Sequence, residues 1–212
     1  MSAALAVCME AFDETRRGVD RLVRLSMLSH YYYARKAIGK PCQPPVGLEL
    51  EDGLTTAIER GFCEYDAYPD GTSARDGCPK RPFLRLTPKH RLLGQSSEPL
   101  GYRKLSATGS ADAWIDSLRH AYPLILSFQW NSSYQNIARG RSVLASSRRP
   151  HFGRHAVAVI GFDSTDDQFI IKDSRGSSFG ANGLWRLPRE LTRSQMFEEV
   201  YAITGVHYVR ET

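Results

Sequence analysis

The sequence predicts an α+β protein whose helices precede its strands. In the first third, apolar residues recur at spacings of three and four, as on one face of a helix. From Tyr122 onward, short runs rich in β-branched residues are bounded by Gly and Asp, which is typical of strands. Helices and strands separated in this way favour two lobes. We expect a single domain over 1–212, with a helical lobe over about 1–100 and a β-rich lobe over about 101–212.

The individual helices and strands are predicted from hydrophobic periodicity and from the Gly, Pro and Ser residues that begin or end them. Ser26 is suited to cap the second helix, and Gly61 to end the third. The expected helices cover residues 3–23, 26–38, 51–60 and 111–121. The expected strands cover residues 123–130, 156–162, 168–172, 184–187 and 199–206. Residues 69–101 are rich in Gly, Pro, Ser and Arg, so we expect a long surface connection with little regular structure.

The composition is that of a globular protein, with 42% hydrophobic and 24% charged residues. The 28 Lys and Arg against 23 Asp and Glu leave a formal charge of +5, which is spread over many segments and does not indicate a nucleic-acid partner. No apolar run approaches the roughly 18 residues of a membrane span. The N-terminal residues lack the positive region of a signal peptide. We therefore expect a cytoplasmic monomer.

The four cysteines, Cys8, Cys42, Cys63 and Cys78, are far apart and form no CxxC pair. A zinc site that includes His90 is not expected, because such sites usually show closely paired ligands. One disulfide among Cys42, Cys63 and Cys78 stays open for an oxidising compartment. Free thiols are the simpler expectation, and we expect neither a metal nor an organic cofactor.

The clearest chemistry lies between Gly153 and Pro188. His155 opens a buried strand, and Asp173 ends the next one. If the two strands form a hairpin, their far ends meet and His155 lies near Asp173. A carboxylate can orient an imidazole, which then activates a thiol or hydroxyl. His155 and Asp173 are therefore the candidate catalytic residues, against the alternatives of a structural histidine and an ordinary turn aspartate.

The stretch RHAVAVIGFD…FIIKDSRGSSFGANGLWRLP resembles the papain-like (C1-type) cysteine peptidases, in which His-Ala-Val starts a strand and Asn-Ser-Trp-Gly follows the next. Upstream, RLSMLSHYYYARKAIG and LEDGLTTAIERGFCEYDAYPDG are similar to further segments of that family, in the form common among bacterial members. The resemblance covers nearly the whole chain in family order. It implies a papain-like fold, peptide or protein substrates and no cofactor.

The same resemblance assigns residue roles. His155 takes the place of the general base, and Asp173 that of the asparagine that orients it. Arg175 replaces the tryptophan that shields this pair from water; alternatively, its guanidinium pairs with Asp173 and competes for it. Phe179 and Gly180 match their family positions.

The family's nucleophilic cysteine sits at the N-terminus of the long central helix, where the helix dipole favours a thiolate. The similarity of SAALAVCME to the stretch that follows it places this cysteine immediately before Met1, and the oxyanion-hole glutamine further upstream. Cys8 is no substitute, because it lies roughly 11–12 Å along the helix axis; its spacing predicts a core residue. For these 212 residues alone we expect negligible peptidase activity.

Three functions follow. The first is a cysteine peptidase whose sequence here is shortened before the nucleophile. The second is an inactive papain-like pseudopeptidase that binds peptide or protein. The third is a related thiol enzyme, such as a transglutaminase-like enzyme or an amidase. The remaining histidines are expected to be solvated or satisfied surface residues: His30, His90, His120, His151 and His207.

Overall fold

A computed structural model describes residues 1–17, 23–40, 47–66, 90–92, 101–107, 111–138, 152–194 and 196–208. The chain forms two compact units. The first comprises Met1–Tyr102 with Thr204–Thr212, and the second comprises Arg103–Ile203. None of the helices in the described part of the chain is long and apolar enough to cross a membrane.

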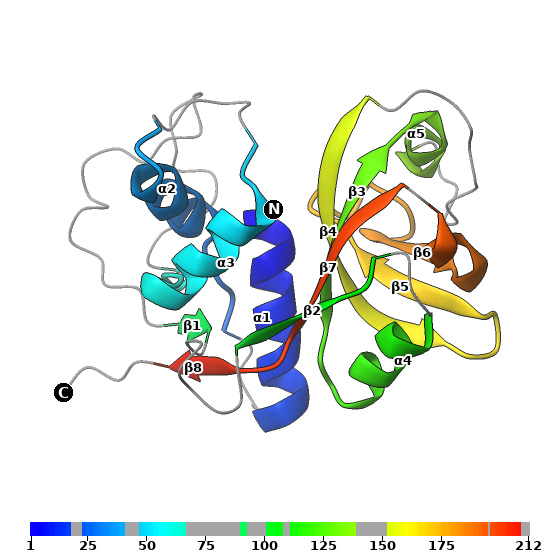
Figure 1. Ribbon diagram of the computed structural model, residues 1–212, viewed down its shortest axis with the longest axis horizontal. Helices are drawn as coiled ribbons and strands as arrows, with labels where there is room; N and C mark the ends of the chain where they lie inside the picture. Colours follow the sequence, from blue (N-terminus) through cyan, green and yellow to red (C-terminus); the bar gives the residue numbers. More distant parts are fainter. Residues whose placement is uncertain are drawn as a thin grey trace. The chain divides into compact units, whose positions relative to one another are not determined.

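The first unit is mainly helical (Figure 1). Its helices are α1 (Ser2–Arg17), α2 (Met27–Ala37) and α3 (Leu50–Glu59), and its two-stranded sheet joins β1 (His90–Leu92) to β8 (Val206–Tyr208). The predicted cap at Ser26 is present, since its hydroxyl oxygen accepts the Ser29 backbone N–H at 3.2 Å. Leu5, Met9 and Leu54 are fully buried, so the helices meet through their apolar faces.

The first helix is shorter than predicted. It ends at Arg17, and Val23 is not helical, although the prediction extended the helix to Val23. The Glu10 carboxylate accepts the Leu25 backbone N–H at 2.6 Å, which ties the returning chain to the side of α1.

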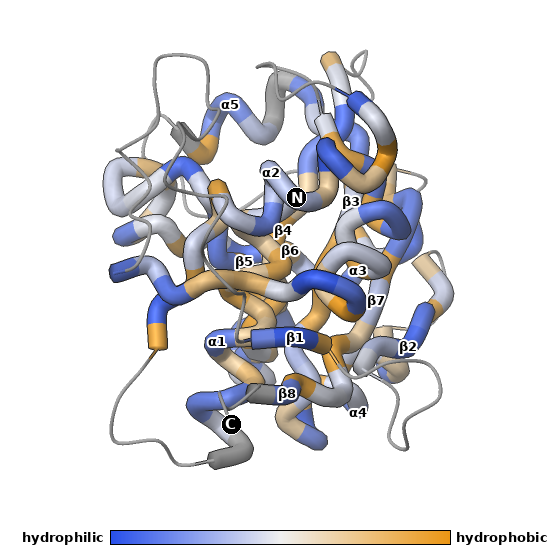
Figure 2. Tube along the Cα trace, turned by 90° about the vertical axis from the view of Figure 1, so that its left-hand side faces the viewer, coloured by the Kyte–Doolittle hydropathy of each residue, from blue (hydrophilic) through white to orange (hydrophobic). Residues whose placement is uncertain are grey.

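The predicted connection over residues 69–101 contains one strand that the sequence reasoning missed. β1 pairs antiparallel with β8, His90 opposite Tyr208. Most of the other residues of this segment lie outside the described residues. Figure 2 draws β1 largely in blue, because His90 and Arg91 are hydrophilic. His90 and Leu92 are nevertheless buried, and a three-residue strand is too short for an alternation that a sequence analysis can detect.

The second unit is built on a six-stranded sheet in the order β2-β7-β3-β4-β5-β6. The strands are β2 (Tyr102–Leu105), β3 (Leu124–Trp130), β4 (Gly153–Asp163), β5 (Gln168–Lys172), β6 (Leu184–Pro188) and β7 (Phe197–Ile203). The strand predicted over 199–206 is divided into β7 and β8. The expected helix over 111–121 is α4 (Ala111–Arg119), whose Trp114 is buried against the sheet.

Three short elements of this unit were not predicted: the edge strand β2, the helix α5 (Ser132–Ala138) and the 3₁₀ helix η2 (Arg189–Arg193). Each is under eight residues, too short for a periodicity to stand out. In Figure 1, α4 lies at the end of the sheet where β3 begins and α5 at the end where β3 finishes. The α5 end of the sheet also carries the start of β4, because Phe128 of β3 pairs with His155.

Candidate active site

The structure brings His155 and Asp173 together at the α5 end of the sheet. Ala158 of β4 pairs with Lys172 of β5, so the residue after Lys172 is a diagonal neighbour of His155. The His155 Nε2 atom lies 3.3 Å from Asp173 Oδ1. Because an ionised carboxylate only accepts, Nε2 carries the hydrogen and the neutral ring keeps Nδ1 as its acceptor. The His155 side chain is 19% exposed and that of Asp173 is 0% exposed.

Asp173 is held by two side chains that sequence reasoning did not single out. The Tyr134 hydroxyl donates to Asp173 Oδ2 at 2.5 Å, and the Trp185 indole N–H donates to the same oxygen at 3.1 Å. The Arg175 backbone N–H donates to Oδ1 at 3.2 Å. The predicted strand over 184–187 already included Trp185, but nothing in the sequence indicated that its indole would meet a carboxylate. Tyr134 lies on the unpredicted helix α5.

These contacts keep the buried carboxylate ionised. Burial by itself raises the pKa of Asp173, but the hydrogen bonds from His155, Tyr134 and Trp185, with the charge of His155, outweigh it and hold that pKa below its usual value. The pKa of the Tyr134 phenol is raised, first by burial and then by its bond to the Asp173 carboxylate. Tyr134 therefore remains a neutral donor, and Asp173 remains a negative partner for the imidazole.

The loop after Asp173 is closed by its own backbone. The Asp173 N–H donates to the Gly183 carbonyl at 3.0 Å, and the Gly183 N–H donates to the Phe179 carbonyl at 2.9 Å. Gly180 has a φ of +61°, and a Cβ there would lie 2.2 Å from the Leu184 carbonyl oxygen. Only glycine fits that position. The Phe179 ring packs on Tyr134 at 5.1 Å between centroids, so this loop supports the donor to Asp173.

Arg175 does not compete for Asp173 with its side chain. Its guanidinium carbon lies 4.8 Å from the ring centroid of Tyr134, 5.3 Å from that of Phe179 and 6.0 Å from that of Trp130. These are cation–π distances. The alternative of an Arg175–Asp173 ion pair is therefore wrong for this structure, in which only the Arg175 backbone contacts Asp173.

The two cysteines that the structure describes are buried thiols outside any disulfide. Cys8 is fully buried, as its spacing predicted, and burial raises its pKa far above the usual range. Burial also raises the pKa of Cys63 to about 11. A thiol needs accessibility and thiolate character to act as a nucleophile, so neither is suited to the role. Cys42 and Cys78 lie outside the described residues, and no group of three His, Cys, Asp or Glu side chains in the described part forms a metal site.

Two of the five other histidines correct the prediction of surface positions. His30 is fully buried, and His90 is 3% exposed. Burial lowers the pKa of His30 to about 4, so this ring is neutral at physiological pH. Both rings lie where the unit's elements meet, a placement that no local pattern around them indicates. His120 and His207 are exposed, and His151 lies outside the described residues.

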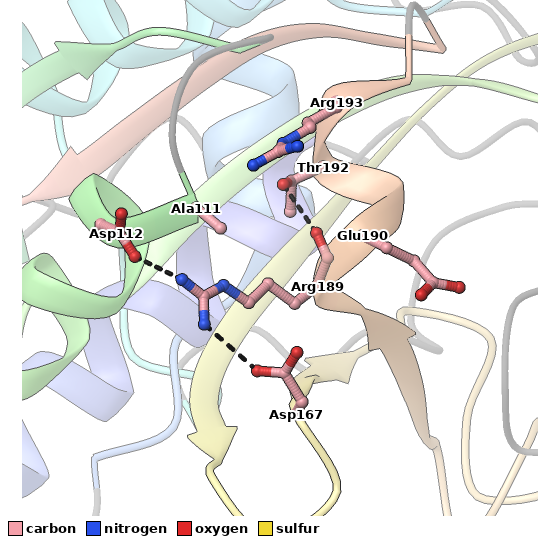
Figure 3. Close-up of a pocket in the computed structure, with 7 residues that line it drawn as sticks. All are labelled: Ala111, Asp112, Asp167, Arg189, Glu190, Thr192 and Arg193. Atoms are coloured by element: carbon pink, nitrogen blue, oxygen red, sulfur yellow. Dashed lines mark hydrogen bonds and ion pairs between the residues drawn. The ribbon is translucent and has the colours of Figure 1, made fainter.

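A hollow of about 280 Å³ lies at the other end of the same sheet (Figure 3). Arg189 of η2 reaches across it and pairs with Asp112 of α4 at 2.5 Å and with Asp167 of the β4–β5 turn at 3.4 Å. The two carboxylates compensate the positive charge of Arg189. Its guanidinium therefore joins three elements, η2, α4 and the β4–β5 turn. His155 does not line this hollow, and we assign no chemistry to it.

Solved structures of papain-like cysteine proteases share the fold of this chain. Xylellain, a cysteine protease from Xylella fastidiosa, superposes with a TM-score of 0.74 at 19% identity, over 99% of this chain and 79% of that one. A cysteine protease from Carica candamarcensis, solved in complex with E-64, gives a TM-score of 0.67 at 17% identity over 99% of this chain and 88% of its own. The predicted papain-like α+β fold is thus confirmed.

The family follows from sequence. The Peptidase_C39 like family matches residues 95–208, a little more than half of the chain, so the chain belongs to that family of papain-like cysteine peptidases. An uncharacterized peptidase C1-like protein of Acanthamoeba polyphaga mimivirus is 32% identical over 167 residues, which cover 74% of this chain and 51% of that protein. A cathepsin B-like protein of Giardia intestinalis is 36% identical over 56 residues, 25% of this chain and 18% of its own. The chain thus spans about half or less of these two relatives.

Proposed function

We propose that the full-length protein is a cysteine peptidase in which His155 and Asp173 serve a thiol supplied by the residue aligned immediately before Met1. The observation that carries this proposal is the 3.3 Å contact between the His155 ring and a buried carboxylate, at the positions where the family pattern has its histidine and asparagine. The contact occupies Nε2 and leaves Nδ1 to exchange a proton with the thiol.

The chemistry then needs no cofactor. The thiolate attacks the peptide carbonyl carbon, and the imidazolium of His155 gives its proton to the leaving amine as the C–N bond breaks. The neutral ring next takes a proton from water, whose oxygen attacks the thioester, and the thiol leaves with that proton. Asp173 fixes the ring orientation throughout and stabilises the imidazolium through its negative charge.

The experiment joins protein chemistry to kinetics. The N-terminus of the native protein is mapped by mass spectrometry, and the genomic sequence just upstream of Met1 is read in frame. The protein carrying that segment is then assayed on a fluorogenic peptide library, as wild type and as His155→Ala. Hydrolysis that His155→Ala abolishes supports the proposal. The proposal would be overturned if the protein carries a cysteine immediately before Met1 and still hydrolyses no peptide of the library.

The pseudopeptidase that binds peptide or protein remains the second candidate. One observation favours it: Arg175 brings a solvated charge to a position where the family pattern has a shielding tryptophan. A native protein that starts at Met1, binds peptides and hydrolyses none would support this function over the first. The coarser assignment to a papain-like peptidase family holds in both cases.

A further inference from the structure

A cluster of aromatic side chains with one cation lies beside His155, and the proposed mechanism does not use it. Trp130, at the end of β3, packs against Phe152 with the rings tilted by 49° and their centroids 5.2 Å apart. Trp130 also contacts Tyr134 at 6.2 Å, and Tyr134 contacts the His155 ring at 5.3 Å. Phe152 is 57% exposed, one of two large apolar side chains that stand out from the described surface. We call Trp130, Phe152 and Arg175 the aromatic–arginine platform.

The local backbone holds the platform in place. The Phe152 backbone N–H donates to the Trp130 carbonyl at 2.9 Å, and Trp130 pairs with Gly153 across the strands. A Cβ on Gly153 would lie 3.1 Å from the Trp130 indole nitrogen, a tighter approach than side chains usually make. Glycine at 153 therefore leaves room for the Trp130 indole next to β4.

Arg175 gives the platform its charge. In the part of the chain that the structure describes, no carboxylate pairs with its guanidinium, which instead lies against three rings. Ring contacts leave the N–H groups at the edge of the guanidinium available, and their fork matches a carboxylate. Two other charges among the described residues near His155 are compensated or hidden: Arg154 pairs with Glu198 at 2.9 Å, and Asp173 is buried with four donors. The exposed field of the platform is therefore positive.

We propose that the aromatic–arginine platform is a subsite for a carboxylate that the peptide substrate carries on the C-terminal side of the scissile bond. The side of the bond follows from the chemistry, because His155 protonates the leaving amine and its surroundings meet the leaving part of the substrate. Trp130 and Phe152 contact the apolar atoms of that residue, and Arg175 pairs with its charge. This inference rests on the proposed function. The carboxylate is that of an Asp or Glu side chain or of the peptide's own C-terminus.

The first experiment measures binding by the 212-residue chain itself. Three pentapeptides of one sequence are compared: one with Glu at the second position and an amidated end, one with Gln and a free C-terminus, and one with Gln and an amidated end. The Trp130 indole N–H signal in two-dimensional NMR reports binding, since the chain has three tryptophans and Trp114 and Trp185 are buried. We expect at least one carboxylate peptide to bind about 3- to 10-fold more tightly than the neutral one.

The variants separate charge from structure. Arg175→Gln should remove the preference, and Arg175→Lys should keep part of it because the charge remains without the fork. Arg193→Gln is the matched control, since Arg193 is also an exposed arginine of the same unit and lies on η2. Thermal melts confirm that each variant folds. Equal binding of the three peptides, or no detectable binding of any, would overturn the proposal. Which carboxylate peptide is preferred tells the side-chain source from the terminal one.

The second experiment tests the carboxylate subsite and the peptidase activity separately, so that either can fail without the other. In the full-length protein, kcat/KM is measured for Glu and Gln substrates with and without Arg175→Gln. Hydrolysis that depends on His155, with a Glu-to-Gln ratio that Arg175→Gln leaves unchanged, contradicts the subsite and leaves the peptidase intact. A carboxylate preference in binding without any hydrolysis supports the subsite and contradicts the peptidase.

Discussion

Two histidines, one in each unit, show how surroundings decide what the same side chain does. His30 is fully buried in the first unit, where Nδ1 lies 2.9 Å from Ser2 Oγ and Nε2 lies 2.9 Å from the Gly53 carbonyl oxygen. It stacks on Phe62 with ring centroids 4.3 Å apart. His155 in the second unit is partly exposed and uses Nε2 on Asp173, while Nδ1 has no partner among the described residues.

The difference lies in the second nitrogen and in the charge nearby. Both nitrogens of His30 are occupied by neutral groups, and burial penalises the charged ring, so it is a neutral packing residue. His155 has a negatively charged partner on Nε2 and keeps Nδ1 for proton exchange. One histidine is suited to hold a fold together, and the other to transfer protons.

The largest expected effect is on kcat/KM, when the imidazole of His155 is removed. In the full-length protein, His155→Ala should lower kcat/KM for a peptide substrate by about 10³-fold or more, because the general acid–base is lost. The exposed His120→Ala serves as control and should leave kcat/KM within about twofold. Retention of most of the activity by His155→Ala would show that the ring transfers no proton in the slow step.

Removal of the carboxylate should cost stability in the second unit. Asp173→Ala leaves the Tyr134 hydroxyl and the Trp185 N–H buried without their acceptor, so we expect about 3 kcal/mol less free energy of unfolding. Asp166→Ala, at an exposed turn position, is the matched control and should change it by under about 0.5 kcal/mol. Urea unfolding of the 212-residue chain measures both. Similar losses in the free energy of unfolding for the two variants would mean that water accepts the hydrogen bonds of Tyr134 and Trp185 in place of Asp173.

Acid should act on the first unit before the second. The pKa of His30 falls from 6.5 in the unfolded chain to about 4 in the folded one, so its contribution is complete above pH 6.5 and is lost as pH falls toward 4. The full loss is about 3 kcal/mol. The pKa of Asp173 is lowered below 3.8, so its contribution persists to pH 3.8 and is lost only below that.

Urea unfolding at about pH 7, 5.5 and 4.5 tests this order. The His30→Gln variant should be less stable at pH 7 but should lose less between pH 6.5 and 4 than the wild type does. Parallel pH dependences of wild type and variant would show that the pKa of His30 is the same in the folded and unfolded chain, which would contradict the effect of its burial.

The smallest effect concerns the phenol that holds Asp173. Tyr134→Phe keeps the ring packing and removes one hydrogen bond to a charged group, so we expect a loss of about 1.5 to 2 kcal/mol. Tyr65→Phe, in the first unit, is the control and should change stability by less than about 0.5 kcal/mol. An equal effect of the two substitutions would mean that the Trp185 N–H alone satisfies Asp173.

Sequence reasoning succeeded where local patterns carry the structure. The five longest strands of the sheet follow from β-branched and apolar runs. A hairpin of β4 with β5 is enough to predict that His155 and Asp173 meet, and the two side chains do so. Ser26 as a cap is equally local. Gly180 matches the family pattern, and the close approach of the Leu184 carbonyl is the physical reason for it.

It failed where the outcome depends on contacts between distant residues. The tertiary arrangement buries His30 and His90. It also brings the Trp185 indole N–H to the Asp173 carboxylate, and no periodicity in the sequence predicts either result. Tyr134 was missed because α5 spans only seven residues. The contact of Arg175 with three rings, rather than with Asp173, likewise depends on side chains from β3, α5 and the loop after β5.

The most direct test of the central claim is the reactivity of the thiol that His155 is proposed to serve. In the native full-length protein, the rate of iodoacetamide alkylation of the cysteine aligned before Met1 is followed by mass spectrometry near pH 6, for wild type and His155→Ala. A thiolate stabilised by the His155 imidazolium should react in the wild type at least about 100-fold faster than in the variant. Equal rates in the two proteins would contradict the account.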